Sequence, residues 1–181
     1  MYSCLLNDNL VTGRDGIGNF KLTNKGWEAA DAIRKPAVMR EKAFVAMWFH
    51  GDLKSVYQEG IEPAIEKTGY SPIRLDLEEY SSSIIDRILS EIKESRFIVA
   101  DFTGHRNGVY FEAGFAKGLG LDVIWTCRKD QMDHLHFDLK GFNVIDWHNE
   151  KDLEERLINR IRAVVGYGPL YDPRIPVEGN A

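Results

Sequence analysis

The sequence has little cysteine, no long apolar run and no excess of positive charge. Its two cysteines, Cys4 and Cys127, fit no metal-ligand spacing, so we expect a reduced cytosolic protein. No apolar stretch approaches the ~20 residues that cross a bilayer, and the first residues lack the basic and apolar segments of a signal peptide. With 23 basic and 28 acidic residues the net charge is -5, which gives no electrostatic reason to expect nucleic-acid binding.

What is present is the composition of a folded globular protein. The 181 residues are 44% hydrophobic and 28% charged, which fits one domain with or without a short appendage. This balance argues against a disordered tail, a collagen-like repeat or a low-complexity segment.

The first 40 residues differ in pattern from the rest. Residues 7–19 are polar and glycine-rich without a hydrophobic period, and we expect a loop there. Phe20–Leu22 predicts a short strand, followed by a helix that Thr23 or Asn24 caps and that Pro36 ends. This segment resembles the last part of a winged-helix module. We therefore interpret residues 1–40 as an appendage or the remnant of a fused domain.

From residue 42 onward, short apolar runs alternate with amphipathic stretches. Strands are expected over Ala43–Trp48, Ser71–Leu75, Phe97–Asp101, Asp122–Cys127 and Phe142–Trp147, and helices over Leu53–Thr68, Ser83–Glu94, Val109–Leu119 and Leu153–Val165. This alternation predicts an α/β fold: a flavodoxin-like five-stranded parallel sheet in the order 2-1-3-4-5, with helices on both faces. We assign this domain to residues 41–168 and a C-terminal tail to residues 169–181.

Ligands of such a sheet bind beyond the carboxyl ends of the strands, where the strand order reverses. That point lies between the first and third strands, and the residues that follow them are candidates for substrate binding. They are Met47, Trp48, Phe49 and His50 after the first strand, and Thr103, Asn107, Gly108 and Tyr110 after the third; Asp76, after the second strand, could flank the same crevice. The aromatic residues among them could stack a base or could be rim and core residues. Arg106 or His105 could meet a phosphate or lie on a solvated loop.

Glu112 lies in the opening turns of the helix that follows the third strand. A helix N-terminus favours negative charge, so we expect this carboxylate to stay ionised. An ionised carboxylate at a crevice can attack an electrophilic carbon or stabilise a developing cation. The small residues Ala113, Gly114, Ala116 and Gly118 would let this helix lie close to the sheet. The glycines Gly114, Gly118 and Gly120 cost helix propensity, which suggests that this close approach matters more than intrinsic helix stability. Taken alone, Glu112 is better explained by dipole complementarity on a surface helix.

Two other carboxylates raise the expectation of a catalytic site. Asp101 ends an apolar strand, where it is a candidate catalytic support or a cap of the following loop. Asp86 precedes Glu112 by 26 residues (112 − 86) and could pair with it or hold a sugar hydroxyl. For Asp86 alone, a solvated helix face is the better explanation.

The segment NGVYFEAGFAKGLG, together with AFVAMWF and GIEPAIEKTGY, resembles the nucleoside 2-deoxyribosyltransferase superfamily. That superfamily also contains 2′-deoxynucleotide N-glycosidases and is related in fold to TIR domains, and the resemblance covers residues 42–147. It implies that Glu112 is the nucleophile on the anomeric carbon and that Asp86 is the acidic helper. It also implies at least a homodimer, in which His136 could reach a neighbouring subunit's pocket.

These observations predict an enzyme that transfers a glycosyl group or cleaves the N-glycosidic bond of a nucleoside or nucleotide, with no cofactor. The histidines and aspartates of residues 133–138 resemble a metal site at first, but no further ligand cluster completes the set, and no metal is expected. Two alternatives stay open: a nucleotide-binding sensor domain and a TIR-like effector that cleaves NAD.

Overall fold

The computed structural model describes residues 9–14, 20–26, 40–75, 84–139 and 141–174. The chain divides into two compact units, Met1–Val38 and Met39–Ala181. Each unit is described by itself.

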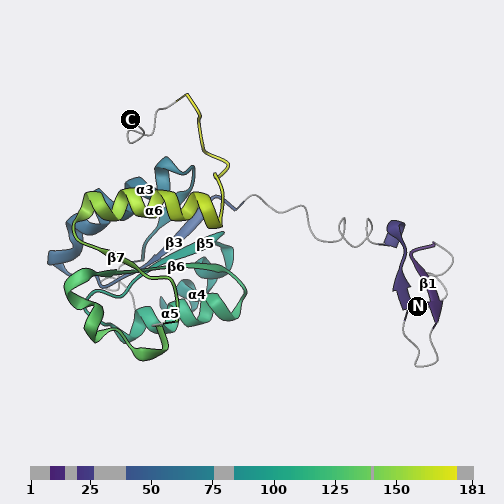
Figure 1. Cartoon of the computed structure of the whole chain (residues 1–181), viewed down its shortest axis with the longest axis horizontal. Coiled ribbons are helices and arrows are strands. Elements are labelled where there is room, and N and C mark those ends of the chain that lie inside the picture. The colour runs from purple at the N-terminus through teal and green to yellow at the C-terminus, as the bar shows by residue number, and fades with distance from the viewer. Residues whose placement is uncertain (1–8, 15–19, 27–39, 76–83, 140, 175–181) are drawn as a thin grey trace. The chain divides into compact units, whose positions relative to one another are not determined.

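The described part of the N-terminal unit is a two-stranded antiparallel hairpin. Strand β1 (Val11–Arg14) pairs with β2 (Phe20–Leu22), as Figure 1 shows. The expectation of a loop over residues 7–19 was therefore wrong for β1, because the polar composition of this segment concealed the β-branched pair Val11 and Thr12. Thr23 caps the next turn as predicted, since its Oγ1 accepts the N–H of Gly26 at 2.9 Å. The rest of the expected helix lies outside the described residues, and the winged-helix resemblance stays a prediction.

The second unit is built on the parallel sheet that the sequence predicts. Its strands are β3 (Lys42–Ala46), β4 (Ser71–Ile73), β5 (Phe97–Asp101), β6 (Asp122–Arg128) and β7 (Ile145–Trp147). They lie in the order β4-β3-β5-β6-β7, every neighbouring pair is parallel, and this is the predicted 2-1-3-4-5 order. The flavodoxin-like architecture is confirmed, and the strand order reverses between β3 and β5.

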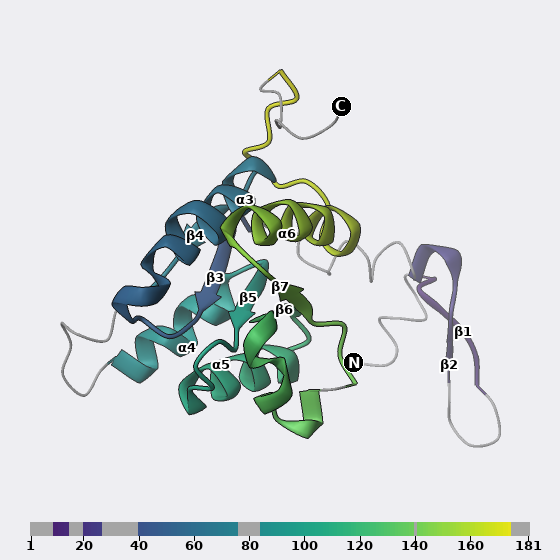
Figure 2. The same cartoon turned by 60° about the vertical axis from the view of Figure 1, so that its left-hand side comes forward.

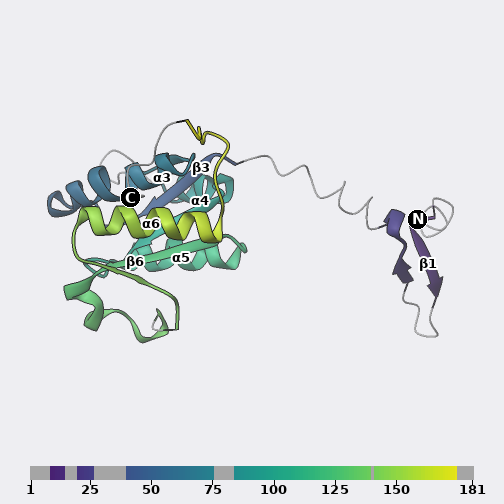
Figure 3. The same ribbon diagram turned by 45° about the horizontal axis from the view of Figure 1, so that its top comes forward.

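Helices cover both faces of this sheet (Figure 2). On one face, α3 (Glu62–Lys67) and α6 (Glu150–Val164) pack on side chains such as Val45, Val99 and Trp147. On the other, α4 (Ile84–Glu94) and α5 (Asn107–Gly118) pack on the alternate side chains of the same strands. Figure 3 shows α6 and α5 on opposite sides of the sheet. Burial on both faces explains why β5 is apolar at every position before Asp101.

The helical segment after β3 is split, as Gly60 and Pro63 led us to expect. A short 3₁₀ turn, η1 (Gly51–Leu53), leads to a π-helical stretch, η2 (Val56–Ile61), and then to α3. A Cβ on Gly60 would lie 3.1 Å from the Leu153 side chain, so glycine permits the close contact with α6. The segment ends at Gly69, whose φ of 84° is the left-handed turn predicted there.

Strand β7 is shorter than predicted. The sequence suggested a strand from Phe142, but that ring instead stacks on Trp125 with centroids 4.5 Å apart, and pairing begins at Ile145. The following helix starts earlier than expected because Asn149 caps it by accepting the N–H of Asp152 at 3.0 Å. Among the described residues, no helix is long and apolar enough to cross a membrane.

Candidate functional site

Two loops meet at the carboxyl edge of the sheet, where the strand order reverses. Trp48, in the loop after β3, is the residue that joins them. Its ring stacks on His50 with centroids 4.4 Å apart, and the Arg106 guanidinium carbon lies 3.8 Å from the centroid of the Trp48 ring. Arg106 belongs to the loop between β5 and α5, so an aromatic–cation contact closes the gap between the two loops.

Gly104 allows the loop after β5 to lie directly against Trp48. Its φ is +81°, and a Cβ built on it would lie 2.4 Å from Cε3 of Trp48. A side chain at this position would therefore be strained in the backbone and would also collide with the indole.

Gly104→Ala is expected to destabilise the protein by about 2 kcal/mol and to move the Trp48 ring. Gly108→Ala is the control, because a Cβ there meets nothing within 4 Å and the residue lies inside α5. Urea unfolding and tryptophan emission measure both effects. Equal stability of the two variants would show that the contact with Trp48 imposes no constraint.

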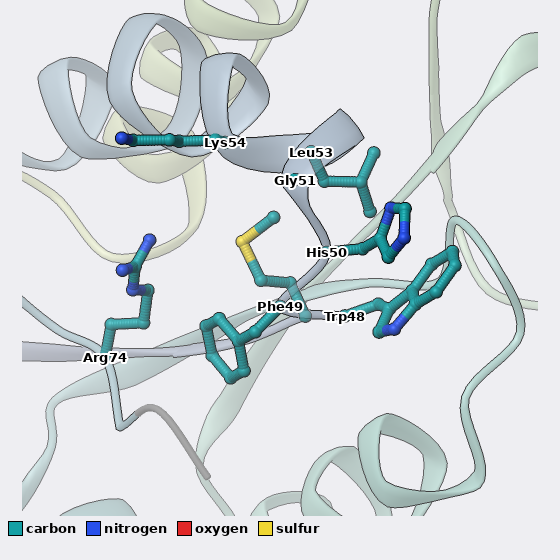
Figure 4. A pocket seen from close by; sticks show the side chains of 8 residues that line it. Trp48, Phe49, His50, Gly51, Leu53, Lys54 and Arg74 are labelled. Atoms are coloured by element: carbon teal, nitrogen blue, oxygen red, sulfur yellow. The ribbon is translucent and has the colours of Figure 1, made fainter. Parts of the chain in front are cut away.

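A hollow of about 170 Å³ opens beside the loop after β3 (Figure 4). Met47, Trp48, Phe49 and His50 all line it, so the structure brings these four predicted substrate-binding residues together. The remaining lining residues are Gly51, Leu53, Lys54 and Arg74. Glu112 does not line this hollow.

Lys54 and Arg74 were not identified from the sequence as members of a site. Arg74 directly follows β4, and β4 pairs in parallel with β3, so its place at the same edge could have been inferred from the strand order. The prediction extended that strand to Leu75 and took Asp76 as the first residue beyond it. Asp76 lies outside the described residues.

Asp101 is buried beneath the edge of the sheet, with no exposed surface. Its Oδ2 accepts Thr126 Oγ1 at 2.6 Å and Trp147 Nε1 at 2.9 Å, and its Oδ1 accepts the N–H of Thr103 at 3.0 Å. Burial raises the pKa of this carboxyl even though hydrogen bonds from Thr126, Thr103 and Trp147 oppose the shift. The geometry favours the loop-capping role and leaves no face of Asp101 open to a ligand. Thr103 is buried with it, and its Oγ1 accepts the N–H of Arg128 at 3.0 Å.

Glu112 is a half-buried carboxylate in the second turn of α5. Burial alone raises its pKa from 4.5 to about 7. The helix N-terminus was expected to favour the ionised form of Glu112, but the pKa shifts in the opposite direction: Glu112 lies five positions after Asn107, the first residue of α5, and the dipole effect fades within the first turn.

The side chains of α5 separate into two flanks. Residues 110 and 112 lie about 160° apart around an α-helix. Tyr110 packs on Phe102, with ring centroids 4.7 Å apart, whereas Glu112 lies on the flank of Phe115, whose ring meets Lys93 of α4. Glu112 thus lies on the flank of α5 opposite to that of Tyr110.

Asp86 is exposed in the first turn of α4, which packs beside α5. The cause of the raised Glu112 pKa is burial and not a neighbouring carboxylate, so the structure gives no sign of a pair between Asp86 and Glu112. The role of Asp86 stays a prediction.

Tyr110 and His136 form a second group, on the other flank of α5. Their ring centroids lie 6.3 Å apart, and His105 Nδ1 lies 3.4 Å from Tyr110 Oη. His136 is exposed and paired with Asp138 at 3.3 Å. Asn107 and Gly108 are exposed in the first turn of α5. The structure thus separates these candidates from the hollow after β3.

The glycines of α5 do not serve the close approach that we expected. A Cβ on Gly114 or Gly118 would meet nothing within 4 Å, and both residues are exposed. Contact with the sheet is made instead by the fully buried Ala113 and Ala116. The prediction was therefore right for Ala113 and Ala116 and wrong for the glycines, because the helix presents its alanines, and not its glycines, to the core.

The fold and the site define a flavodoxin-like α/β protein with candidate binding residues at its switch point. Comparison with solved structures finds a similar chain, "Structure of Clostridium botulinum CMP N-glycosidase, BcmB", with a TM-score of 0.51 and 18% sequence identity. The match covers 64% of this chain and 97% of that one. No family model matches the sequence, and no curated protein matches it. At this identity the likeness shows the fold.

Proposed function

We propose that this protein cleaves the N-glycosidic bond of a nucleoside or nucleotide, with Glu112 as the nucleophile. The observation that carries the proposal is the half-buried Glu112 carboxylate in the second turn of α5, whose pKa burial raises to about 7, because strongly perturbed carboxyl groups gather at functional sites. The fold likeness to a CMP N-glycosidase and the resemblance of the Glu112 segment to the nucleoside 2-deoxyribosyltransferase superfamily support the same assignment.

The chemistry divides into two displacements. The ionised Glu112 carboxylate forms a bond to C1′ of the sugar while the bond from C1′ to the base nitrogen breaks, and that electron pair leaves with the base. The base takes a proton from an acid, a role for which Asp86 or water is available. Water then attacks C1′ and gives up one proton, to the acid that protonated the base or to solvent, while the bond from C1′ to the Glu112 oxygen breaks; this releases the sugar and regenerates the carboxylate. A second base in place of water would give transfer instead of hydrolysis.

Incubation with a panel of compounds tests this function. We expect free base to be released from at least one nucleoside or 5′-nucleotide by the wild-type protein and not by Glu112→Gln, as measured by liquid chromatography. Release of nicotinamide from NAD would point instead to the TIR-like effector. Tight binding of a nucleotide without release of base would point to the sensor domain.

A further inference from the structure

We propose that a second hollow, formed by residues 132–144 and here called the hollow before β7, binds a small organic ammonium ion with an apolar body. Its volume is about 390 Å³, and it shares no lining residue with the hollow after β3. The proposal concerns a separate site and a different class of ligand, so it does not rest on the proposed function.

The hollow exists because one connection of the sheet is short. On the face that α4 and α5 cover, these helices of 11 and 12 residues lead from β4 to β5 and from β5 to β6. The connection from β6 to β7 packs on the same face with only two 3₁₀ turns, η4 (Lys129–His134) and η5 (Phe137–Leu139), which are green in Figure 2. Two short turns cover less of a sheet than the helix that usually joins parallel strands, and open space is left beside them.

The floor of this hollow is apolar. Leu135 and Leu139 are buried in it, and Met132 and Val144 lie half-buried beside them. Small-molecule sites are typically concave, of roughly 300–1,000 Å³, and lined by apolar side chains with a few polar groups that fix orientation. The volume and the lining therefore suit the apolar part of a small ligand.

Asp133 is the charged residue of the lining, and it selects the sign of the ligand. It is exposed, and within the described part of the chain it makes no ion pair. Its neighbours Asp130 and Asp138, by contrast, pair with Arg128 at 2.7 Å and with His136 at 3.3 Å. The Asp133 carboxylate is thus available to a cation.

Basic side chains around this segment are engaged elsewhere. Lys129 pairs with Asp146, and Arg160 donates to the backbone oxygen of Asn143 at 3.1 Å and to its Oδ1 at 2.9 Å. Asn143 lines the hollow, whereas neither Lys129 nor Arg160 does. With a net charge of -5 on the chain as a whole, the surroundings also favour a cationic ligand.

Phe142 supplies an aromatic face to the same hollow. Its ring stacks on Trp125, with centroids 4.5 Å apart and an interplanar angle of 23°, and 40% of Phe142 stays exposed. A cation over the face of an aromatic ring is attracted by the negative charge of that face. Because Trp125 holds the ring in place, Phe142 and Asp133 form a two-sided site for the ammonium group while the floor takes up the apolar body.

Three compounds with the same carbon skeleton test the proposal: 3-phenylpropylammonium, 3-phenylpropan-1-ol and 3-phenylpropanoate. We expect the ammonium ion to bind the full chain about threefold to tenfold more tightly than the alcohol, and the carboxylate to bind more weakly than the alcohol. Carbon-13 labels in the methionine methyl groups locate the ligand by nuclear magnetic resonance. The signal of Met132, assigned with Met132→Leu, should shift, and that of Met47, which lines the hollow after β3, should not.

Asp133→Asn removes the charge at an exposed position and leaves the core intact. It is expected to bring the affinities for the ammonium ion and the alcohol to within about twofold of each other. Asp138→Asn is the control, because Asp138 is an exposed carboxylate of η5 that does not line the hollow, and it should keep the preference. Equal binding of ammonium ion and alcohol, an unchanged preference in Asp133→Asn, or a shift of Met47 in place of Met132 would each overturn the proposal.

Discussion

Replacing Glu112 by glutamine is expected to lower base release by about 10³-fold and, at the same time, to stabilise the fold above pH 7. Glutamine is nearly the same size but cannot form the glycosyl ester that the mechanism requires. Substitution of a residue that only supports the structure would not change activity and stability in opposite directions, because it would lower both together. A substitution that lowers activity while it raises the free energy of unfolding is characteristic of a functional charge held in a half-buried site.

The sign of the stability change follows from the pKa. Burial raises the pKa of Glu112 from 4.5 to about 7, so between these values the folded protein keeps a proton that the unfolded chain has released. The free energy of unfolding contributed by this group therefore falls as pH rises from about 4.5 to about 7, and it stays low at higher pH. When the partial exposure of the side chain is allowed for, ionised Glu112 lowers the free energy of unfolding by about 2 kcal/mol above pH 7.

Urea unfolding at pH 5 and pH 8 measures this effect. Glu112→Gln is expected to lose the fall in stability between the two pH values, whereas the control Glu155→Gln, at an exposed position of α6, is expected to keep it. In the wild-type protein, kcat/KM should rise with pH through about 7 as the nucleophile ionises. A Glu112→Gln protein that kept wild-type activity would refute the mechanism.

The sheet was predictable because burial on both faces leaves a clear signal. Phe97–Asp101 is apolar until its last residue, and the same residues form β5 in the structure. The alternation of such runs with amphipathic stretches limits the topology to a few parallel arrangements. The four residues after β3 that line the hollow followed from this topology, since ligands bind where the strand order reverses.

The parts that were not predictable depend on side-chain contacts between distant segments. Arg74 is placed by the rings of Phe49 and Tyr57, which lie on other elements, and no local pattern in the sequence indicates those contacts. The glycines of α5 illustrate the same difficulty. Propensity shows that they weaken a helix, but only the packing shows that Gly114 faces open space while Ala113 faces the sheet.

The pKa of Glu112 is a further quantity that the sequence concealed. Its place near the start of a helix suggested a stabilised anion, yet desolvation decides the direction of the shift. Burial of a single carboxylate depends on how the elements around it pack, which the spacing of residues does not determine.

Asp101→Ala is expected to destabilise the fold by about 3–5 kcal/mol, the largest stability change that we predict. The substitution leaves three donors without a partner at the buried edge of the sheet: Thr126 Oγ1, Trp147 Nε1 and the N–H of Thr103. These donors come from β6, from β7 and from the loop after β5, so one carboxylate holds together the edge on which the candidate site lies.

Asp101→Asn is expected to cost nearly as much. The asparagine side chain keeps one oxygen that accepts hydrogen bonds. The NH₂ group that replaces the second carboxylate oxygen is a donor, and it would face donors of the protein instead of acceptors. Thr126→Val, which removes one of the three donors and little volume, should cost only about 1–2 kcal/mol, and should cost less still when Asp101 is already alanine. Urea unfolding of the two single variants and the double variant measures this coupling, and Asp133→Ala is the control at an exposed carboxylate. Additive effects of Asp101→Ala and Thr126→Val would contradict the network, because two groups that bond to each other cannot be lost independently.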